Sequence, residues 1–247
     1  MIDKETKESI GIVLANVPYK ENSTIVTFSG EEGIFSCIAR DIYKPKSNLK
    51  PLLVIGNLVK IEYNSSKENV NFIKGVSIIS DYSSLSVSYE KNIFLLYLQE
   101  MSLKLFSYGD AFPFEETNAI LHSIKKDKNI LSMSLLFLGS LYNCLGIKPN
   151  IKECVRCKNT KNIIGISFKD GGFVCNKCAN NLDYVCKDIM DLYVFKYAFG
   201  NIDEDSINKI VPKENGIKML TMLHDYLLDY FDAGKSKSFP LLLSLFN

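Results

Sequence analysis

Two pairs of cysteines with the same spacing constrain the fold of this chain most. The pairs are Cys154 with Cys157, and Cys175 with Cys178, and seventeen residues separate them. A tetrahedral zinc site needs four ligands at one point, and each C-x2-C turn supplies two thiolates. The intervening segment has a strand-like run at 163–168 and a turn at 169–172, which is typical of a short hairpin. The sequence therefore predicts one zinc ion held by these four cysteines. Two disulfides, or two pairs that coincide by chance, are the alternatives.

Four cysteine ligands leave no open position on zinc for water or substrate, so we expect a structural site rather than a catalytic one. The other three cysteines, Cys37, Cys144 and Cys186, are scattered along the chain. An odd number of cysteines with metal-type spacing indicates a reducing compartment. The first residues also lack the apolar segment of a secretory signal peptide. We therefore expect a cytoplasmic protein.

The first eighty residues predict a small all-β domain. Strands are expected where β-branched residues or alternating polarity dominate, at 10–14, 23–28, 34–40, 58–63 and 70–79, with a loop at 64–69. Five short antiparallel strands, with a longer connection between the third and the fourth, fit a barrel of the OB type. Another small barrel, such as an SH3-like one, remains the alternative because the pattern alone does not separate the two.

Residues 81–247 predict an all-α domain. Helices are expected at 92–106, 113–125, 130–145, 183–199, 203–206 and 215–232. The segment 129–147 carries no charge and has about the length of a membrane span, but its serines and glycines favour a buried helix and no membrane contact. The expected fold class is α+β. It comprises a five-stranded OB-type β-barrel in 1–80 and an all-α domain in 81–247, with a four-cysteine zinc knuckle inserted at about 150–180.

The connection between the third and fourth predicted strands contains the candidate DNA-binding residues. They are Arg40, Lys44, Lys46 and Lys50, with Tyr43 among them and one acid. Cations beside an aromatic ring suit a strand of phosphates with stacked bases. A solvated loop of ordinary charge is the alternative, and the net charge of the whole chain is only +1.

The zinc segment is also locally basic. Residues 148–177 contain seven cations and two acids, a net charge of +5 in thirty residues. These cations either contact nucleic acid or offset the negative charge of the cysteine thiolates, and the sequence does not choose between the two.

No sequence motif indicates catalysis. The chain lacks a phosphate-binding glycine loop, a nucleophile elbow and an H-E-x-x-H pair. The two histidines, His122 and His224, lie within expected helices and are interpreted as surface or packed residues. We therefore expect no catalytic residues and no enzyme. A zinc-dependent hydrolase or nuclease is the alternative, and it requires an exchangeable metal ligand.

The order of these parts resembles the family of the bacterial recombination-mediator protein RecO. The likeness is carried by the first hairpin, the basic segment and a closing segment: Gly11–Leu14, Tyr19–Ser23, Ile25–Phe28, Gly33, Ala39–Arg40, Lys46–Ser47, Leu49–Leu52, Gly234–Lys235 and Lys237–Ser238. The family usually has a glycine where Asp41 stands here. The corner at Lys20–Glu21 is also followed by an unusual Asn22–Ser23. We expect these departures to change loop geometry and to leave the fold intact.

The resemblance implies a role in DNA repair and recombination after DNA damage, close to the nucleoid. It implies binding to single- and double-stranded DNA, annealing of complementary strands, and loading of the recombinase onto strands coated by single-strand-binding protein. RecR and the C-terminal tail of the coating protein are the implied partners. Because that tail ends in acids and an apolar residue, its receptor needs a cation beside an apolar group, and the candidates are Lys235, Lys237 and Phe239. A zinc-stabilised protein-interaction module without direct DNA binding is the alternative function.

Overall fold

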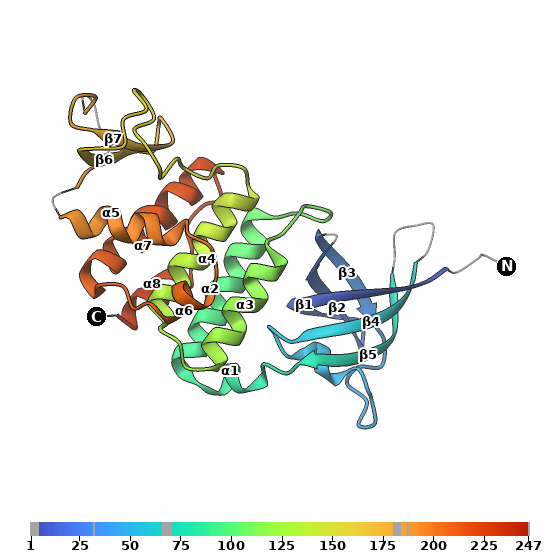
Figure 1. The fold of residues 1–247 in the computed structure, drawn as a ribbon. Coiled ribbons are helices and arrows are strands. Elements are labelled where there is room, and N and C mark those ends of the chain that lie inside the picture. Colours follow the sequence, from blue (N-terminus) through green and yellow to red (C-terminus); the bar gives the residue numbers. More distant parts are fainter. Residues whose placement is uncertain (1–4, 32, 66–70, 180–183, 187, 247) are drawn as a thin grey trace. The chain divides into compact units, whose positions relative to one another are not determined.

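The computed structural model describes residues 5–31, 33–65, 71–179, 184–186 and 188–246 (Figure 1). The chain forms two compact units, Met1–Lys126 with Ser236–Leu245, and Asp127–Lys235 with Phe246–Asn247. The boundary that the sequence predicts after residue 80 falls inside the first unit, which holds the barrel together with several helices.

Five strands of the first unit close into a barrel in the order β1-β2-β3-β5-β4. They are β1 (Glu5–Tyr19), β2 (Ser23–Gly30), β3 (Gly33–Ala39), β4 (Leu58–Ser65) and β5 (Phe72–Ser80). The predicted α+β class with an N-terminal five-stranded barrel is thereby confirmed. One expectation is wrong, because the strands are not all antiparallel: β3 and β5 pair in parallel at Ile38 and Phe72. Most of the loop predicted at 64–69, and Val70, lie outside the described residues.

Strand β1 is longer than the run at 10–14 that the sequence predicts. It contains fifteen residues because it has two partners, β4 along its first half and β2 along its second half. The register with β2 shifts between Val13 and Ala15, which is the β-bulge expected where a barrel strand bends.

The connection between β3 and β4 is part of the barrel core. Ile42, Leu49 and Leu52 are at most 6% exposed and pack among the apolar residues of the strands. Its second half forms the short 3-10 helix η1 (Lys50–Leu53). Burying each of these side chains contributes about 1.5–3 kcal/mol, so the exposed residues between them are held on a fixed segment.

The helices of the first unit are α1 (Ser83–Val87), α2 (Tyr89–Leu105), α3 (Phe114–Lys125) and α8 (Phe239–Ser244). The segment after α2 also extends the barrel. The backbone N–H of Ile34 donates to the carbonyl of Asp110 at 3.0 Å, and the N–H of Gly109 donates to the carbonyl of Ile34 at 2.7 Å. Gly33 permits this approach, because a Cβ there would lie 2.3 Å from the Asp110 oxygen.

The helices of the second unit are α4 (Ile130–Cys144), α5 (Ile189–Ala198), α6 (Glu204–Asn208) and α7 (Lys213–Tyr230). Helix α4 is the predicted uncharged helix and is buried along most of its length. Gly139 lets it approach α5, because a Cβ there would meet the carbonyl of Ala198 at 1.7 Å. None of the helices in the described ranges is long and apolar enough to cross a membrane.

The helix expected from residue 183 begins later, at Ile189. The residues just before it form β8 (Tyr184–Val185), which pairs with β6 (Ile163–Ser167), and β6 also pairs with β7 (Gly172–Cys175). The three strands form a small sheet in the order β7-β6-β8. Strand β8 has only two residues and pairs with β6, about twenty residues earlier in the chain, so a local sequence pattern does not reveal it.

Candidate metal centre and nucleic-acid interface

The structure brings the four predicted cysteines together in the second unit. Their sulfur atoms all lie within 4.8 Å of one another. The hairpin of β6 and β7 returns the second pair to the first, as the sequence predicts, and Cys175 ends β7. Each pair is a tight turn: the N–H of Lys158 donates to the carbonyl of Cys154 at 2.9 Å, and the N–H of Cys178 donates to that of Cys175 at 3.0 Å.

The sulfur atoms are close enough together to ligate one metal ion. Zinc–sulfur bonds of about 2.3 Å place the sulfur atoms of a tetrahedron roughly 3.8 Å apart. Cys157 Sγ and Cys175 Sγ are 3.6 Å apart. All four are free thiols, as are the other three cysteines. The cluster could therefore hold one metal ion through four sulfur ligands.

The thiols of Cys154 and Cys178 have pKa values shifted in opposite directions. Burial raises the pKa of Cys154, but hydrogen bonds from the backbone N–H groups of Cys175 and Cys157 outweigh it, and the pKa falls to about 6. Hydrogen bonding to Cys157 and burial raise the pKa of Cys178 to about 12. A bound cation would stabilise the deprotonated form of all four cysteines, because a metal-ligating cysteine must be a thiolate.

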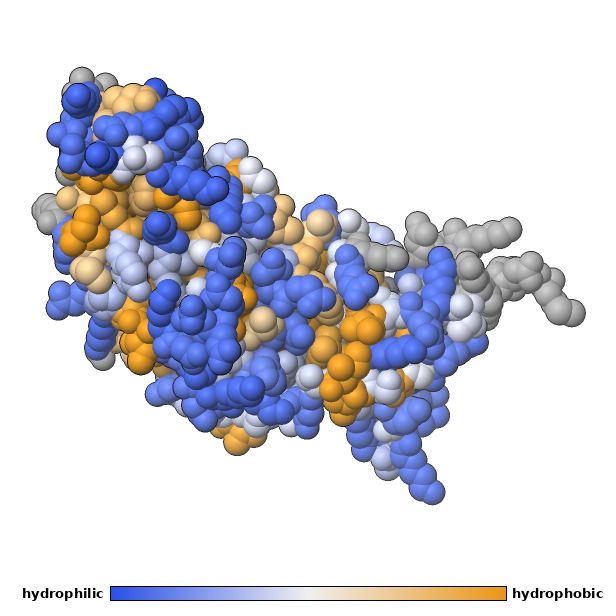
Figure 2. All heavy atoms as spheres, viewed as in Figure 1, coloured by the Kyte–Doolittle hydropathy of each residue, from blue (hydrophilic) through white to orange (hydrophobic). Residues whose placement is uncertain are grey.

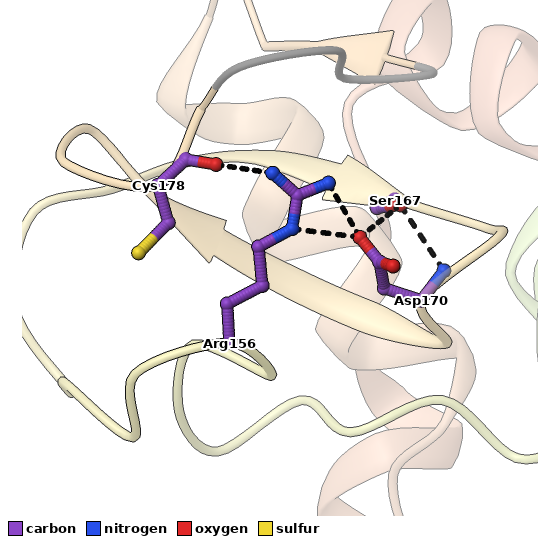
Figure 3. Close-up of polar contacts among 4 residues, drawn as sticks. All are labelled: Arg156, Ser167, Asp170 and Cys178. Carbon is purple, nitrogen blue, oxygen red and sulfur yellow. Dashed lines mark hydrogen bonds and ion pairs between the residues drawn. The ribbon is translucent and has the colours of Figure 1, made fainter.

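Hydrogen bonds from Arg156, in the first cysteine turn, reach the second cysteine turn and the turn of the hairpin (Figure 3). Its Nε and one terminal nitrogen donate to Oδ2 of Asp170 at 2.8 and 2.6 Å, and the other terminal nitrogen donates to the carbonyl of Cys178. The hydroxyl of Ser167 donates to the same Asp170 oxygen at 2.9 Å. Arg156 and Ser167 hold the pKa of Asp170 below its ordinary value. Arg156 therefore has an internal structural role, which the sequence alone did not indicate.

Aromatic side chains join the hairpin to the helices of the second unit. The rings of Phe168 and Tyr226 stack with centroids 4.5 Å apart, and Phe173 lies 5.7 Å from Phe195. The hydroxyl of Tyr226 donates to the carbonyl of Phe168 at 3.3 Å. Such pairs add about 0.5–1.5 kcal/mol each beyond the area they bury. These rings therefore anchor the cysteine segment to helices α5 and α7.

Both acids of the basic cysteine segment are engaged within it. Asp170 pairs with Arg156, and Glu153 pairs with Lys158 at 3.3 Å. The lysines of this segment are exposed: Lys148, Lys152, Lys158, Lys161, Lys169 and Lys177. Figure 2 shows a mainly hydrophilic surface over the segment around β6 and β7.

The predicted DNA-binding residues Arg40, Lys44, Lys46 and Lys50 are all exposed, on the segment between β3 and β4. Lys44, Lys46 and Lys50 lie between the buried residues Ile42, Leu49 and Leu52, and Arg40 precedes Ile42 by two positions. Tyr43 is 43% exposed. The segment therefore presents exposed cations beside an accessible ring, and its assignment to DNA stays a prediction.

The backbone conformation of Asp41 shows how the loop accommodates an aspartate where the family usually has a glycine. Its φ is +57°, the left-handed conformation that a glycine adopts without cost. The loop therefore keeps its backbone without the glycine, because aspartate tolerates this region better than most residues. The side chain also pairs with Lys44 at 3.0 Å, and both groups are more than half exposed. We conclude that Asp41 weakens the local positive charge rather than the fold.

The structure adds residues that sequence reasoning missed at this end of the barrel. The guanidinium of Arg40 lies 3.9 Å from the ring centre of Phe72, the first residue of β5. Lys20 Nζ lies 5.1 Å from the ring centre of Tyr19, at the end of β1. The backbone N–H of Ile42 donates to the carbonyl of Asn22 at 3.1 Å, which places the turn after β1 beside the basic segment. The partners of Arg40 and Ile42 are distant in sequence, so a local pattern does not reveal them.

The predicted partner-binding residues differ in exposure. Lys235 and Lys237 are exposed, whereas Phe239 is 6% exposed and its ring centre lies 5.8 Å from that of Tyr97. The backbone N–H of Lys237 donates to Glu100 at 2.8 Å, so this lysine lies on a fixed segment of the first unit. The assignment of a partner to these residues stays a prediction.

Within the described ranges, the cysteine cluster is the only group of three or more side chains placed to ligate a metal. His122 is exposed, and His224 is 2% exposed within α7, as surface and packed residues respectively. These positions agree with the interpretation of both histidines from the sequence.

Comparison with known proteins covers almost the whole chain. The family described as "Recombination protein O N terminal" matches residues 3–82, and "Recombination protein O C terminal" matches residues 87–238. The DNA repair protein RecO of Halalkalibacterium halodurans is 24% identical over 224 residues, which cover 89% of this chain and 88% of that protein. The protein of the same name from Oceanobacillus iheyensis is 23% identical over 229 residues, covering 90% and 86%.

A third relative, the DNA repair protein RecO of Syntrophomonas wolfei, is 28% identical over 175 residues, covering 69% of each chain. Among solved structures, asparaginyl-tRNA synthetase from Pyrococcus horikoshii aligns with 78% of this chain and 43% of its own, at 10% identity and a TM-score of 0.30. That structural likeness is too weak to carry an argument.

Proposed function

Because this chain belongs to the recombination protein O family, whose relatives are named DNA repair proteins, we propose that it is a DNA-binding recombination mediator. It binds single- and double-stranded DNA, anneals complementary strands, and helps to load the recombinase onto strands coated by single-strand-binding protein. It does so at the nucleoid and without enzymatic activity. The observation that supports the proposal best is the exposed basic segment Arg40–Lys50, which buried side chains fix to the barrel.

Fluorescence anisotropy with labelled DNA tests the binding step. We expect the full chain to bind single-stranded and double-stranded oligonucleotides at low salt, and to accelerate pairing of complementary strands that are coated by single-strand-binding protein. A chain that binds neither form of DNA at low salt would contradict the proposal. Cleavage of the DNA in the presence of metal would instead indicate the nuclease alternative.

We further propose that the cysteine cluster holds one structural zinc ion. Thiolate ligands favour zinc among the common divalent cations of cells, and the four sulfur atoms lie within 4.8 Å of one another, close enough to ligate one ion. Bound zinc would link the two cysteine turns and would supply no open position for a reaction. Metal analysis of the purified protein should find one zinc ion per chain. Replacing any of the four cysteines should abolish zinc binding.

RecR and the C-terminal tail of single-strand-binding protein are the proposed protein partners. The support is the family relationship and the exposure of Lys235 and Lys237, which suit the acids of that tail. Because Phe239 is buried against Tyr97, it supports the position of its segment, and the two lysines carry the contact. Binding of a labelled tail peptide should weaken in Lys237→Ala and remain unchanged in Lys209→Ala, an exposed lysine elsewhere. Equal affinities would place the tail at another site.

A chain that binds the tail peptide but no DNA would favour the alternative of a zinc-stabilised protein-interaction module. The two measurements together therefore separate the two functions.

A further inference from the structure

Arg40 and Phe72 form a cation–aromatic pair at one end of the barrel. The guanidinium carbon lies 3.9 Å from the ring centre, close enough for the two planar groups to stack. Phe72 is half-buried and fixed by the parallel pairing with Ile38, where the backbone N–H of Ile38 donates to the carbonyl of Asn71 at 2.8 Å. Arg40 is exposed at the end of β3. The barrel therefore fixes the Phe72 ring, and the exposed Arg40 guanidinium lies over it.

The pair differs from the lysines beside it in what it offers to a nucleic acid. Lys44 pairs with an acid at 3.0 Å, and Lys50 donates to the carbonyl of Pro45 at 2.8 Å. The partner that the described part of the chain gives to Arg40 is instead an aromatic ring. A lysine ammonium binds a phosphate as a point charge, whereas a guanidinium stacked on a ring presents a second planar face. A planar face of this kind stacks on a base.

Two further exposed rings lie at the same end of the barrel. Tyr19, which is 37% exposed, ends β1, and Tyr43, which is 43% exposed, follows Ile42 on the basic segment. The hydrogen bond between Ile42 and Asn22 holds these two parts of the chain together. Rings interleaved with cations are what binding of a single strand requires, because unpaired bases need flat surfaces and their phosphates need charge.

We propose that the stacked pair Arg40–Phe72 is a binding platform for an unpaired nucleobase of single-stranded DNA. The inference rests on the proposed DNA binding and adds to it a base-binding site and a cause of strand preference. In a duplex the base faces are covered by their neighbours, so the platform contributes only to single-strand binding. The lysines of the segment contribute to both forms through phosphate contacts.

Two variants remove the stack in different ways. Arg40→Lys keeps the charge and removes the planar group, and Phe72→Leu keeps an apolar side chain and removes the ring. The full-length proteins are titrated with a labelled oligothymidine, with the same length of chain made of abasic sites, and with a duplex. Stacking of one base is worth about a fivefold change in affinity at the lower end of its range.

The wild-type chain should bind oligothymidine at least about fivefold more tightly than the abasic strand. Both variants should reduce that difference, and their affinity for the duplex should fall less than their affinity for oligothymidine. The matched control Lys46→Ala should weaken binding to all three ligands and keep the difference between oligothymidine and the abasic strand. Circular dichroism at the titration temperature checks that each variant is folded. If Phe72→Leu does not fold, the affinities of Arg40→Lys for oligothymidine and the abasic strand decide the test.

Failure of the inference is distinguishable from failure of the proposed function. A wild-type chain without DNA affinity would remove the function on which the platform depends. A wild-type chain that binds oligothymidine and the abasic strand equally, or an Arg40→Lys variant that keeps the wild-type difference, would overturn the platform and leave DNA binding in place.

Discussion

The carboxylate of Glu100 accepts two hydrogen bonds from Ser238, one from its backbone N–H at 2.7 Å and one from its hydroxyl at 2.5 Å. The hydroxyl of Ser236 and the backbone N–H of Lys237 also donate to this carboxylate, at 2.7 and 2.8 Å. Glu100 on α2 therefore fixes the segment that leads into α8, although 138 residues separate it from Ser238. The closing motif by which the chain resembles its family has this structural role.

The first prediction concerns this carboxylate. Burial raises the pKa of Glu100, but the hydrogen bonds from Ser238, Lys237 and Ser236 outweigh it and lower the pKa from 4.5 to about 2. The folded-state pKa is thus below the unfolded one, so the stabilisation is complete above about pH 4.5 and is lost as the pH falls towards 2. Allowing for solvent screening, it amounts to about 1–2 kcal/mol.

Thermal unfolding of Glu100→Gln, measured between pH 7 and pH 3, checks this prediction. The variant should be less stable than the wild type at pH 7, and the two should converge as the pH falls. Glu115→Gln, an exposed glutamate of α3, serves as the control and should follow the wild type. A constant difference between Glu100→Gln and the wild type across this range would contradict the assignment.

The second prediction concerns an ion pair between α5 and α7 whose acid is buried and whose lysine is partly exposed. Asp191 is 0% exposed, and Lys218 Nζ and Asn215 Nδ2 each donate to its carboxylate at 2.8 Å. Lys218→Met leaves a buried negative charge without its cation, which costs about 3–5 kcal/mol. Asp191→Asn should cost less, because the Lys218 side chain is 41% exposed and its ammonium can be hydrated. Urea unfolding of both variants gives the order, and a smaller loss for Lys218→Met would contradict it.

The third prediction uses Asp41. Replacing it by glycine removes the left-handed strain and the acid that pairs with Lys44. We expect stability within about 1 kcal/mol of the wild type and a steeper decrease of single-strand affinity with salt, by up to about 0.7 in log–log slope. Asp127→Gly is the matched control, because Asp127 also has a positive φ, of 60°, and loses the same charge. Equal slopes in the two variants would show that the segment around Asp41 is not at the DNA interface.

The fourth prediction concerns Cys175. Cys175→Ala should lose the bound zinc and increase hydrogen exchange in the segment 150–179, because the two cysteine turns are no longer linked. The stacked rings of Phe168 and Tyr226 should keep the turn of the hairpin attached, and the barrel strands should retain their protection. Cys144→Ala, outside the cluster, should keep the metal. Loss of protection in the barrel of Cys175→Ala would contradict the prediction.

Much of the fold follows from local pattern, and the exceptions have a common cause. The alternation of Val59, Ile61 and Tyr63 predicted β4, and the spacing of the cysteines predicted the hairpin that brings them together. The extra length of β1 and the presence of β8 depend on partners distant in sequence, and a local pattern does not reveal them.

The same limit applies to the candidate sites. The four cysteines and the basic segment were predicted, because ligand spacing and charge are local features of the sequence. The pairing of Arg40 with Phe72 was not, since it depends on the register between β3 and β5. The burial of Phe239 was also missed, because it depends on packing against Tyr97.

The central claim is that the fixed basic segment between β3 and β4 contacts the phosphates of DNA. The most direct test is the salt dependence of single-strand affinity in the wild type and in the triple variant Lys44→Ala, Lys46→Ala and Lys50→Ala. Each phosphate contact contributes about 0.7 to the log–log slope for single strands, so the account predicts a slope that is smaller by up to about 2 in the triple variant. The variant Lys148→Ala, Lys152→Ala and Lys161→Ala, which removes the same charge from the cysteine segment, should keep a larger slope. A triple variant of the basic segment with the wild-type slope would contradict the claim.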